Sequence, residues 1–555
     1  MNNQVKLKTI SSLKKLYHGD NSPTNTLSNF SMLKNEKKSF QIVIESAYDF
    51  NGELLLDSPF DKTSVYSVEH IKSDFPMFKG ADDYYRYSKD SYYPDLLLPV
   101  EKTIKITKGI NVFWVEICSD SQSIGENIIK ILLSENGAII AETSVNVEVI
   151  NCELDFDNFV YTNWFHTDCL MSHYGFDAFS DEYWRVTENF LKTANEYGMN
   201  CVLTPIFTPP LDTEIGKERP TVQLVDIFIK NGTYSFNFDK LTHWIEMSEK
   251  CGIKYFEMAH FFTQWGARHA PKIMATVDGE YKKIFGWETK ATSKEYKKFL
   301  TDFSIEFKKY LEERNLKNRV LIHVSDEPNF TMLGSYAKAS KLIHKLYKGY
   351  KIVDALSDVW FYKLGIVSNP IPSNDHIHNF LSKSKDLWTY YCSAQNKKFV
   401  SNRFFCNDSI RTRVIGYQMF KFNIKGFLHW GYNFYYSQLS KDVIDPFKVS
   451  DAGGKFPSGD SYTVYPAKDG TAYHSIRLKV FFDALQDMAA LNALEKLTNK
   501  EECLKIIEES GKHSITFSNY PHNDEWLLNT REKVNAKIKE IITNGDLQWG
   551  NFLKQ

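Results

Sequence analysis

Over the first 150 residues, apolar and polar side chains alternate in short segments, which is the pattern of β-strands that bury one face. Such segments lie at 39–45, 103–107, 111–117 and 144–150. Gly, Asn, Asp and Pro residues separate them, as is typical of turns between antiparallel strands. The pattern predicts an N-terminal antiparallel β-sandwich over residues 1–152.

From about residue 155 the pattern changes to short continuous apolar runs separated by longer stretches with helical periodicity. Eight apolar runs precede residue 435, at 159–165, 201–207, 255–259, 320–325, 352–356, 364–367, 387–391 and 427–430. Alternating βα units predict parallel strands, and eight of them predict a (β/α)8 barrel of the TIM type. We therefore expect a barrel domain over residues 153–500, followed by a helical C-terminal extension over 501–555.

Composition narrows the classes of protein that this chain fits. Its 555 residues, 43% hydrophobic and 15% aromatic, can bury a large core in several domains. The net charge is -2 and no long run of one sign occurs, so we expect no nucleic acid partner. No apolar stretch approaches the roughly 18 residues that cross a membrane, so we expect no membrane insertion. The oligomeric state stays open.

The eight cysteines are scattered, without a Cys-x-x-Cys pair or a His spacing of the zinc-site kind. They predict neither a disulfide framework nor a metal site, and no motif indicates a cofactor. The N-terminal region is rich in Lys and has no apolar segment like that of a signal peptide. We therefore predict a cytoplasmic protein, although a secreted protein trimmed of its signal peptide would look the same.

The fourth apolar run ends in two adjacent carboxylates, Asp326 and Glu327, followed by Pro328. In a (β/α)8 barrel the active site lies at the carboxyl ends of the strands, where this pair falls. Two carboxyl groups this close do not both ionise readily, because their negative charges repel. The pair can therefore present a proton donor beside a carboxylate near neutral pH. Taken alone, an Asp-Glu pair is more often a turn with a solvated neighbour, and its surroundings decide.

Polar and aromatic residues follow most of the other predicted strands. Because the carboxyl ends of barrel strands share one rim, these side chains should converge on one pocket. The candidates are Trp164, His166, Asp168, Glu257, Trp265, Tyr391, Arg403, Trp430 and Asn433. Singly, each is more simply explained as a core or loop residue. Together, without a phosphate-binding glycine loop, they favour a neutral, hydroxyl-rich ligand such as a sugar.

Several longer motifs resemble a known family. They are Asn-Trp-Phe-His-Thr-Asp at 163–168, the segment 208–225 that begins Thr-Pro-Pro-Leu-Asp-Thr, Ser-Asp-Glu-Pro at 325–328, Gly-Asp at 459–460, Val-Tyr-Pro at 464–466 and Ser-Ile-Arg at 475–477. These motifs are similar to glycoside hydrolase family 123, and the segment 93–99 resembles that family's N-terminal β-domain. The resemblance implies a β-N-acetylgalactosaminidase that releases terminal β-linked N-acetylgalactosamine from glycolipid-type or related glycans.

The resemblance also implies a retaining, substrate-assisted mechanism, in which the 2-acetamido oxygen of the sugar is the nucleophile. Glu327 would be the general acid and then the general base. Asp326 would accept the acetamido N–H and favour the positive charge that develops on the ring-closed intermediate. Adjacent carboxylates suit this chemistry better than a two-carboxylate mechanism, whose acids stand on opposite sides of the anomeric carbon.

The remaining roles in the site are secondary expectations. A tyrosine that donates to the acetamide oxygen is expected in a site of this type, and Tyr391 is the first choice, with Tyr390 second. Trp430 would form the floor under the sugar ring, and Trp164 or Trp265 a wall. The candidates for contacts to the O3 and O4 hydroxyls, where galacto and gluco epimers differ, are His166, Asp168 and Arg403.

Two alternatives stay open at this point. One is a two-carboxylate glycosidase, retaining or inverting, that acts on another sugar and uses Glu257 or Asp168 opposite Glu327. The other is a catalytically inactive carbohydrate-binding protein, against which the intact acid pair argues. Substrates that lack the 2-acetamido group separate the two enzymes, since only the two-carboxylate enzyme cleaves them. The aglycone and the linkage are not determined by the sequence.

Overall fold

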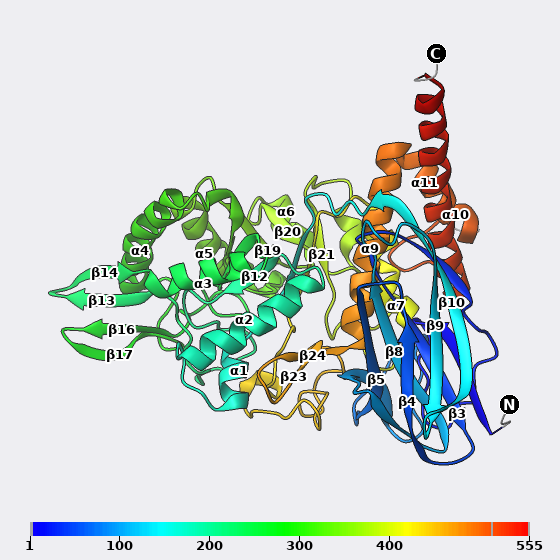
Figure 1. Cartoon of the computed structure of the whole chain (residues 1–555). Helices are drawn as coiled ribbons and strands as arrows, with labels where there is room; N and C mark the ends of the chain where they lie inside the picture. Colours follow the sequence, from blue (N-terminus) through cyan, green and yellow to red (C-terminus); the bar gives the residue numbers. More distant parts are fainter. Residues whose placement is uncertain (1–3, 512–513, 553–555) are drawn as a thin grey trace. The chain divides into compact units, whose positions relative to one another are not determined.

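The computed structural model describes residues 4–511 and 514–552 and divides into two compact units (Figure 1). The first unit runs to residue 158 and also includes 397–422 and the chain from 473 onward, while the second comprises 159–396 and 423–472. The units therefore interleave along the chain, whereas the sequence predicts three consecutive domains. In particular, the helical segments that follow the last two barrel strands belong to the first unit.

The first unit contains the predicted β-sandwich. One sheet has the order β1 (Val5–Ser11), β3 (Lys37–Ser46), β8 (Gly109–Cys118), β5 (Lys62–Lys72), β6 (Tyr92–Pro99), with β24 (Ala472–Ser475) paired to β6. The other has the order β2 (Asn29–Lys34), β10 (Ala138–Glu153), β9 (Gly125–Glu135), β4 (Phe50–Asp57), β7 (Thr103–Ile106). The pairings are antiparallel, with β2 and β10 running parallel.

Alternation along each strand builds the sandwich core. Phe40, Ile42 and Ile44 of β3 point to the same side as one another and are fully buried. Ile129 and Ile131 of β9 belong to the same apolar cluster. Because side chains in a strand alternate between faces, this period of two is what made the sandwich predictable.

Five helices complete the first unit: α7 (Ser409–Arg413), α8 (Ile415–Lys421), α9 (Ile476–Leu497), α10 (Lys500–Gly511) and α11 (Asp524–Phe552). The longest buried one, α9, begins at Ser475, whose hydroxyl accepts the amide of Leu478. Gly416 lets α8 approach it closely, since a Cβ there would lie 2.0 Å from the carbonyl oxygen of Ala484. Across the residues described, we find no helix long and apolar enough to cross a membrane.

The second unit is built on an eight-stranded parallel barrel. In chain order its strands are β11 (Val160–Asn163), β12 (Cys201–Thr204), β15 (Tyr255–Met258), β18 (Val320–His323), β19 (Lys351–Ala355), β20 (Asn369–Ile371), β21 (Trp388–Tyr390) and β22 (Gly426–His429). Neighbouring strands pair in parallel, and β11 pairs with β22. A parallel bridge between Ser373 and Tyr390 joins the last two edges, so the barrel is nearly closed.

Helices of the second unit follow the first five strands, and they run from turquoise (α1, α2) to yellow-green (α6) in Figure 1. They are α1 (Thr167–Tyr174), α2 (Asp181–Glu196), α3 (Asp239–Lys250), α4 (Lys294–Glu313), α5 (Leu333–Leu346) and α6 (Val359–Lys363). The hydroxyls of Ser180 and Ser293 cap α2 and α4 by accepting amides of the first turn. The apolar stripe of α4 includes Phe299, Phe303 and Phe307, spaced at helical intervals and fully buried.

The sixth strand differs from the prediction. The apolar run 364–367 is not a strand, because Leu364 caps the short helix α6 and Gly365 follows in the left-handed region at φ 67°. The strand β20 begins five residues later and contains Pro370, which pairs opposite Asp354. Proline lacks the amide that a regular strand donates to its neighbour, so a segment that contains it is not predicted as a central strand.

A four-stranded sheet that the sequence analysis did not predict extends the barrel loops. Its order is β14 (Thr233–Asn237), β13 (Asp226–Lys230), β16 (Ile273–Val277), β17 (Glu280–Phe285), and its two hairpins project from the barrel in Figure 1. Aromatic side chains pack it against α4: the ring centroids of Phe236 and Phe285 lie 6.1 and 5.2 Å from that of Phe299. The loops after barrel strands β12 and β15 are therefore braced from outside the barrel.

Candidate active site

A cavity of about 230 Å³ opens at the carboxyl ends of the barrel strands. Each wall comes from a loop that follows a different strand, as expected for a (β/α)8 barrel. Its lining consists of Trp164, Leu211, Asp212, Gln264, Trp265, Asp326, Glu327, Ala355, Tyr390, Cys392, Ser393, Leu428, Trp430, Gln438, Leu439 and Phe456. Aromatic faces and a few polar groups thus surround the predicted acid pair.

The acid pair lies just beyond the end of β18, on a sharply bent backbone. The amides of Val324 and Ser325 donate to Asp354 Oδ1, at 3.0 and 3.3 Å, which fixes the chain before the pair. Glu327 has φ 38°, a region that a non-glycine residue rarely adopts, and its amide donates to the carbonyl of Ala355 at 3.1 Å. Asp326 is half-buried and Glu327 is exposed toward the pocket.

The surroundings raise the pKa of both acids. Burial and the neighbouring Glu327 lift the pKa of Asp326 well above its ordinary value, while the charge of His323 acts in the opposite direction. Burial also raises the pKa of Glu327, against the effect of a hydrogen bond from Tyr390. Solvent still reaches Glu327, which moderates the effect of burial there. The pair therefore loses its shared proton at a higher pH than ordinary carboxyl groups do, which suits a general acid.

Tyr390 and not Tyr391 faces the site. The hydroxyl of Tyr390 donates to Glu327 Oε1, and its ring lines the cavity. Tyr391 is fully buried and packs against Phe427 and His429, with ring centroids 4.9 and 5.5 Å apart. Successive residues of a strand point to opposite faces, so only one of two neighbouring tyrosines can face the pocket. The first choice for the acetamide donor is thereby corrected from Tyr391 to Tyr390.

A buried charge network lies inside the barrel beneath the pair. His323 Nε2 is 2.5 Å from Glu257 Oε1, and His323 Nδ1 is 3.4 Å from Asp354 Oδ1. Burial lowers the pKa of His323, but these two carboxylates outweigh burial and raise the pKa to about 10, so His323 is an imidazolium. Glu257 also accepts from Thr162 Oγ1 at 2.6 Å and from Trp164 Nε1 at 2.8 Å. Glu257 thus braces the barrel and does not line the pocket, contrary to the sequence prediction.

Three predicted tryptophans do line the cavity. Trp164 is 3% exposed, and its indole N–H is held by Glu257 as described above. The indole of Trp430 is partly buried and donates to Asp460 Oδ2 at 3.0 Å. Trp265 lines the cavity, is 39% exposed and has φ 63°, a region that non-glycine residues rarely adopt. Fixed indoles of this kind form flat apolar surfaces suited to sugar rings.

His166 and Asp168 contact other residues of the protein and do not line the cavity. Asp168 forms a buried bidentate ion pair with Arg219, at 2.7 and 2.8 Å. His166 Nε2 is 2.8 Å from the carbonyl oxygen of Trp430, and its Nδ1 is 3.2 Å from the Arg219 guanidinium. Burial and the Arg219 charge lower the pKa of His166 to about 3, so this ring stays neutral. Neither residue lines the cavity, so the contacts to O3 and O4 predicted for them are not supported.

Asn433 and Arg403 also lie outside the lining. The side chain of Asn433 forms two hydrogen bonds with the backbone of His166, at 2.8 and 3.0 Å, and so joins the loops after the first and last strands. Arg403 is buried and belongs to the first unit, within the segment 397–422. The side-chain amide of Asn433 is therefore used within the barrel rim, and Arg403 is not part of the second unit that forms the cavity.

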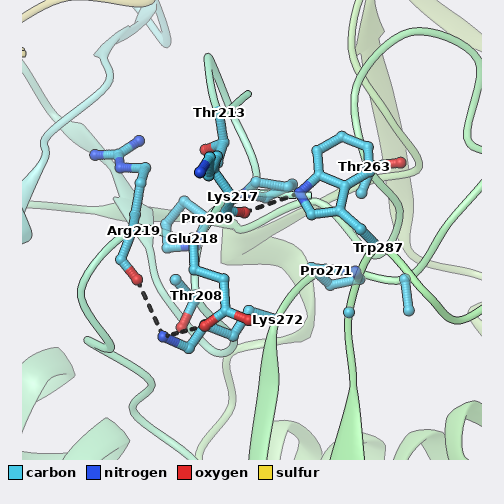
Figure 2. Close-up of a pocket in the computed structure, with 13 residues that line it drawn as sticks. Thr208, Pro209, Thr213, Lys217, Glu218, Arg219, Thr263, Pro271, Lys272 and Trp287 are labelled. Atoms are coloured by element: carbon cyan, nitrogen blue, oxygen red, sulfur yellow. Dashed lines mark hydrogen bonds and ion pairs between the residues drawn. The ribbon is translucent and has the colours of Figure 1, made fainter. Parts of the chain in front are cut away.

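The loop 208–219 is fixed to its surroundings by three further contacts (Figure 2). Lys272 reaches Glu218, 3.0 Å away, and the carbonyl of Arg219 at 3.2 Å. The indole N–H of Trp287 donates to the carbonyl of Lys217 at 3.1 Å. Together with the Asp168 ion pair, these contacts hold the loop in place beside the site.

The same loop carries a carboxylate, Asp212, that the sequence motif contains but that was not among the candidate site residues. Asp212 lines the cavity, and its pKa is raised to about 6 by burial, although the amide of Leu439 and the charge of Arg219 oppose this. Its amide donates to Gln264 Oε1 at 2.5 Å. The motif at 208–225 contained Asp212, but no strand pattern places that residue, since it lies eight residues beyond the end of β12. Only the observed course of the loop brings it to the pocket.

No metal site accompanies these groups in residues 4–511 and 514–552, where no set of three or more His, Cys, Asp or Glu side chains could hold an ion. The cavity presents the carboxyl groups of Asp212, Asp326 and Glu327, the hydroxyl of Tyr390 and aromatic walls. An acid pair that keeps one proton can protonate a leaving oxygen and then activate water.

Comparisons with known proteins agree with this arrangement. A family model described as "Glycoside hydrolase 123, catalytic domain" matches residues 164–494. A family 123 glycoside hydrolase from Clostridium perfringens, studied for glycolipid glycan hydrolysis, has a TM-score of 0.73 at 15% identity over 99% of this chain and 100% of that chain. A family 39 glycoside hydrolase from Bacteroides cellulosilyticus reaches only 0.32 at 10% identity, over 83% of this chain and 81% of that one. No curated protein matches the chain.

At 15% identity, the likeness to the Clostridium perfringens enzyme shows a common fold. The family model covers more than half of the chain, and its match begins at Trp164 and includes the acid pair. On this evidence the protein is a glycosidase, and it belongs to glycoside hydrolase family 123.

Proposed function

We propose that this protein is a retaining exo-β-N-acetylgalactosaminidase that works by substrate-assisted catalysis. The observation that carries the proposal is the acid pair itself: Asp326 and Glu327 are sequence neighbours at the end of one strand, inside an aromatic pocket. Carboxylates of a two-carboxylate glycosidase stand about 5 to 9.5 Å apart on opposite sides of the anomeric carbon. Neighbouring residues suit a mechanism in which the substrate supplies its own nucleophile.

The partners expected for a two-carboxylate mechanism are engaged elsewhere. Glu257 accepts hydrogen bonds from Thr162, Trp164 and His323 inside the barrel. Asp168 is held in its buried pair with Arg219. Both carboxylates contribute to the rigidity of the site, which supports the substrate-assisted interpretation over its rival.

In the first step, the acetamide oxygen forms a bond to the anomeric carbon while the bond to the leaving oxygen breaks. Glu327 gives its proton to that oxygen. In the second step, Glu327 takes a proton from water, the water oxygen bonds to the anomeric carbon, and the bond to the acetamide oxygen breaks. Two inversions leave the β configuration unchanged, as a retaining enzyme requires.

Asp326 acts on the acetamide nitrogen in this proposal. When the acetamido N–H donates to Asp326, the ionised form of this acid is favoured and the shared proton moves to Glu327, where the leaving group needs it. The imidazolium of His323 supports the negative charge on Asp326, whose pKa it lowers. Tyr390, whose hydroxyl donates to Glu327, would donate to the acetamide oxygen of the bound substrate.

N-acetylgalactosamine is the sugar we propose, in terminal β-linkage. The support is the family membership together with the motifs at 163–168, 208–225 and 325–328. The Clostridium perfringens relative acts on glycolipid glycans, and we extend that class of glycan to this protein as part of the proposal. We also propose that it acts in the cytoplasm.

A panel of aryl β-glycosides that differ at C2 and C4 tests the proposal. We expect turnover of the 2-acetamido galactoside, with the 2-hydroxyl galactoside left intact and the gluco epimer cleaved more slowly. Cleavage of 2-hydroxyl glycosides at comparable rates would favour the two-carboxylate mechanism. An absence of cleavage over the whole panel, by folded protein, would favour a carbohydrate-binding role.

A further inference from the structure

We propose that Asp212 is the residue that binds a hydroxyl group at the non-reducing edge of the sugar, at C3, C4 or C6. This inference rests on the proposed function and assigns a specificity-determining residue to the same site. The acid pair that meets C1 and C2 follows β18, whereas Asp212 follows β12, with β15 between the two strands. A pyranose ring that meets the pair with C1 and C2 lies in the same cavity as Asp212, a carboxylate separate from the pair, which can therefore meet one of the remaining hydroxyl groups.

The carboxylate of Asp212 is held in place on one side. Its Oδ2 accepts the amide of Leu439 at 2.9 Å, and its carbonyl oxygen accepts the hydroxyl of Ser440 at 2.7 Å. Its amide, as described above, donates to Gln264. Asp212 is thus tied to the loops after β15 and β22, and its carboxylate has a fixed direction.

The other carboxylate oxygen, Oδ1, can accept further hydrogen bonds. Among the described residues, Asp212 Oδ1 has no hydrogen-bond partner, and no Lys or Arg forms an ion pair with this carboxylate. Arg219, whose charge lowers the pKa of Asp212, already forms a bidentate ion pair with Asp168. An ionised carboxylate accepts up to about four hydrogen bonds, so Asp212 can take one or two more from a ligand in the cavity.

These features select hydroxyl groups as the ligand. Asp212 lies on a wall with Trp265 and Leu211, where an apolar ring face fits and a charged ligand finds no cation among the described lining residues. The neighbouring Gln264 amide is partly engaged, because its oxygen accepts from the backbone amide of Asp212 and one N–H donates to the carbonyl of Thr213 at 3.2 Å. Asp212 supplies the carboxylate on this wall, and a carboxylate accepts from a hydroxyl of a neutral sugar.

The backbone geometry agrees with a functional role. Asp212 has φ 41° and its partner Leu439 has φ 64°, both in the left-handed region that non-glycine residues rarely adopt. Two such residues in contact, both lining the cavity, indicate that the loops are held against local preference to present this carboxylate. Asparagine tolerates the same conformation, so an Asp212→Asn variant tests the charge without breaking the loop.

The experiment measures each of several variants on each of several monodeoxy substrates. Wild type, Asp212→Asn and Glu214→Gln are assayed on an aryl β-N-acetylgalactosaminide and on its 3-, 4- and 6-deoxy analogues. Glu214 is the matched control, since it lies in the same loop and pairs with Lys441 at 3.0 Å but does not line the cavity. Thermal melting of each variant accompanies the kinetics.

We expect Asp212→Asn to lower kcat/KM on the parent substrate by roughly 10- to 100-fold, mostly through KM, because a hydrogen bond to a charged group is lost. On the deoxy analogue that lacks the bound hydroxyl, wild type and Asp212→Asn should be equal within a factor of about two, and this pattern identifies the position. Glu214→Gln should match wild type on every substrate.

Three outcomes overturn the inference. An equal loss of kcat/KM on the parent and on all three deoxy analogues, with a lower melting temperature, would mean that Asp212 only holds the loops together. A loss in kcat on every substrate that azide restores in Asp212→Ala makes it a catalytic carboxylate of a two-carboxylate mechanism. If wild type does not cleave the parent glycoside, the proposed function itself fails, independently of how the variants compare.

Discussion

Two aspartates in the two units show how differently buried charge can be used. In the first unit, Asp487 is completely buried between two guanidinium groups, with Arg413 at 2.7 Å and Arg531 at 2.9 Å. Burial alone would raise the pKa of Asp487, but these two cations outweigh it and the pKa is lowered. In the second unit, Asp326 has Glu327 as its neighbour and the pKa is raised well above the ordinary value.

The difference lies in the balance of charge around each acid. The first-unit cluster includes further matched pairs of carboxylate and guanidinium, such as Arg531 with Glu36 and Arg477 with Asp95, and its role is to hold helices and strands together. Around Asp326, the carboxylates Glu327, Asp354 and Glu257 outnumber the single cation His323. An excess of carboxylates beside a cavity raises the pKa of the acids there, and shifted pKa values of this kind are typical of catalytic sites.

The largest expected effect comes from removing the proton of the pair. On a substrate with a poor leaving group, Glu327→Gln should lower kcat by roughly 10²- to 10⁴-fold, because the departing oxygen is no longer protonated. Activated aryl glycosides need less protonation and should lose less. Steady-state kinetics on both substrate types decides the matter, and equal losses on the two would assign the proton transfer to another residue.

The same substitution at the two aspartates should have opposite effects on stability at pH 7. Asp487→Asn breaks a buried ion pair and should destabilise the protein by about 3 to 5 kcal/mol. The folded pKa of Asp487 is lowered, so its stabilisation is present above the unfolded pKa of about 4 and is lost at lower pH. The melting temperature of Asp487→Asn should therefore approach that of wild type as the pH falls below about 4.

Asp326→Asn, in contrast, should raise the melting temperature at pH 7 while activity falls. The folded pKa of Asp326 is raised, so the acid destabilises the fold increasingly as the pH rises above the unfolded pKa of about 4. Asparagine removes that cost and keeps the shape. Calorimetry of both variants across pH 3 to 8 checks the comparison, and a fall in melting temperature for Asp326→Asn at pH 7 would contradict it.

Trp430 provides a smaller test, between apolar packing and ligand binding. Its indole lines the cavity and is partly exposed, so Trp430→Ala should weaken sugar binding by roughly 1 to 3 kcal/mol and cost less stability than a fully buried tryptophan. Trp244, which is fully buried, is the control, and Trp244→Ala should destabilise by about 3 to 5 kcal/mol. Melting with and without ligand separates the two effects, and similar melting temperatures for both variants would contradict the assignment.

The smallest expected effect is a dependence of KM on pH. The pKa of Asp212 is raised to about 6 by burial, and the ionised form is the better acceptor for a sugar hydroxyl. KM should therefore fall several-fold as the pH rises through about 6, and this change should be absent in Asp212→Asn. A pH profile of KM on an activated glycoside tests it, and an identical profile in the variant would argue against ionisation of Asp212.

The sequence predicted those parts of the fold that follow a simple period. Alternation identified the sandwich strands, and seven of the eight barrel strands coincide with predicted apolar runs, as does the strand end that carries Asp326 and Glu327. The exception, β20, contains Pro370, and the inserted four-stranded sheet consists of short strands in which partly buried and exposed residues mix without a clear apolar face. Neither has the pattern on which strand prediction depends.

The side chains around the acid pair were harder to predict, because their direction depends on tertiary contacts. Trp164, Trp265 and Trp430 line the cavity as predicted. Polar candidates such as Glu257 and Asp168 bind other buried side chains, Trp164 and Arg219 respectively, since buried polar groups need partners. Asp212 reaches the pocket only through a loop whose course is set by Arg219, Lys272 and Trp287, and no local pattern in the sequence reports such contacts.

Inhibition by the thiazoline analogue of N-acetylgalactosamine tests most directly whether the sugar's own acetamide is the nucleophile. The analogue copies the ring-closed intermediate, so it should bind wild type far more tightly than free N-acetylgalactosamine does. Asp326→Asn should remove most of that advantage and leave binding of the free sugar nearly unchanged, because only the cyclised form places positive charge beside the carboxylate. A thiazoline that binds no tighter than the free sugar, or a 2-fluoro sugar that forms a stable ester on Asp326, would contradict the mechanism.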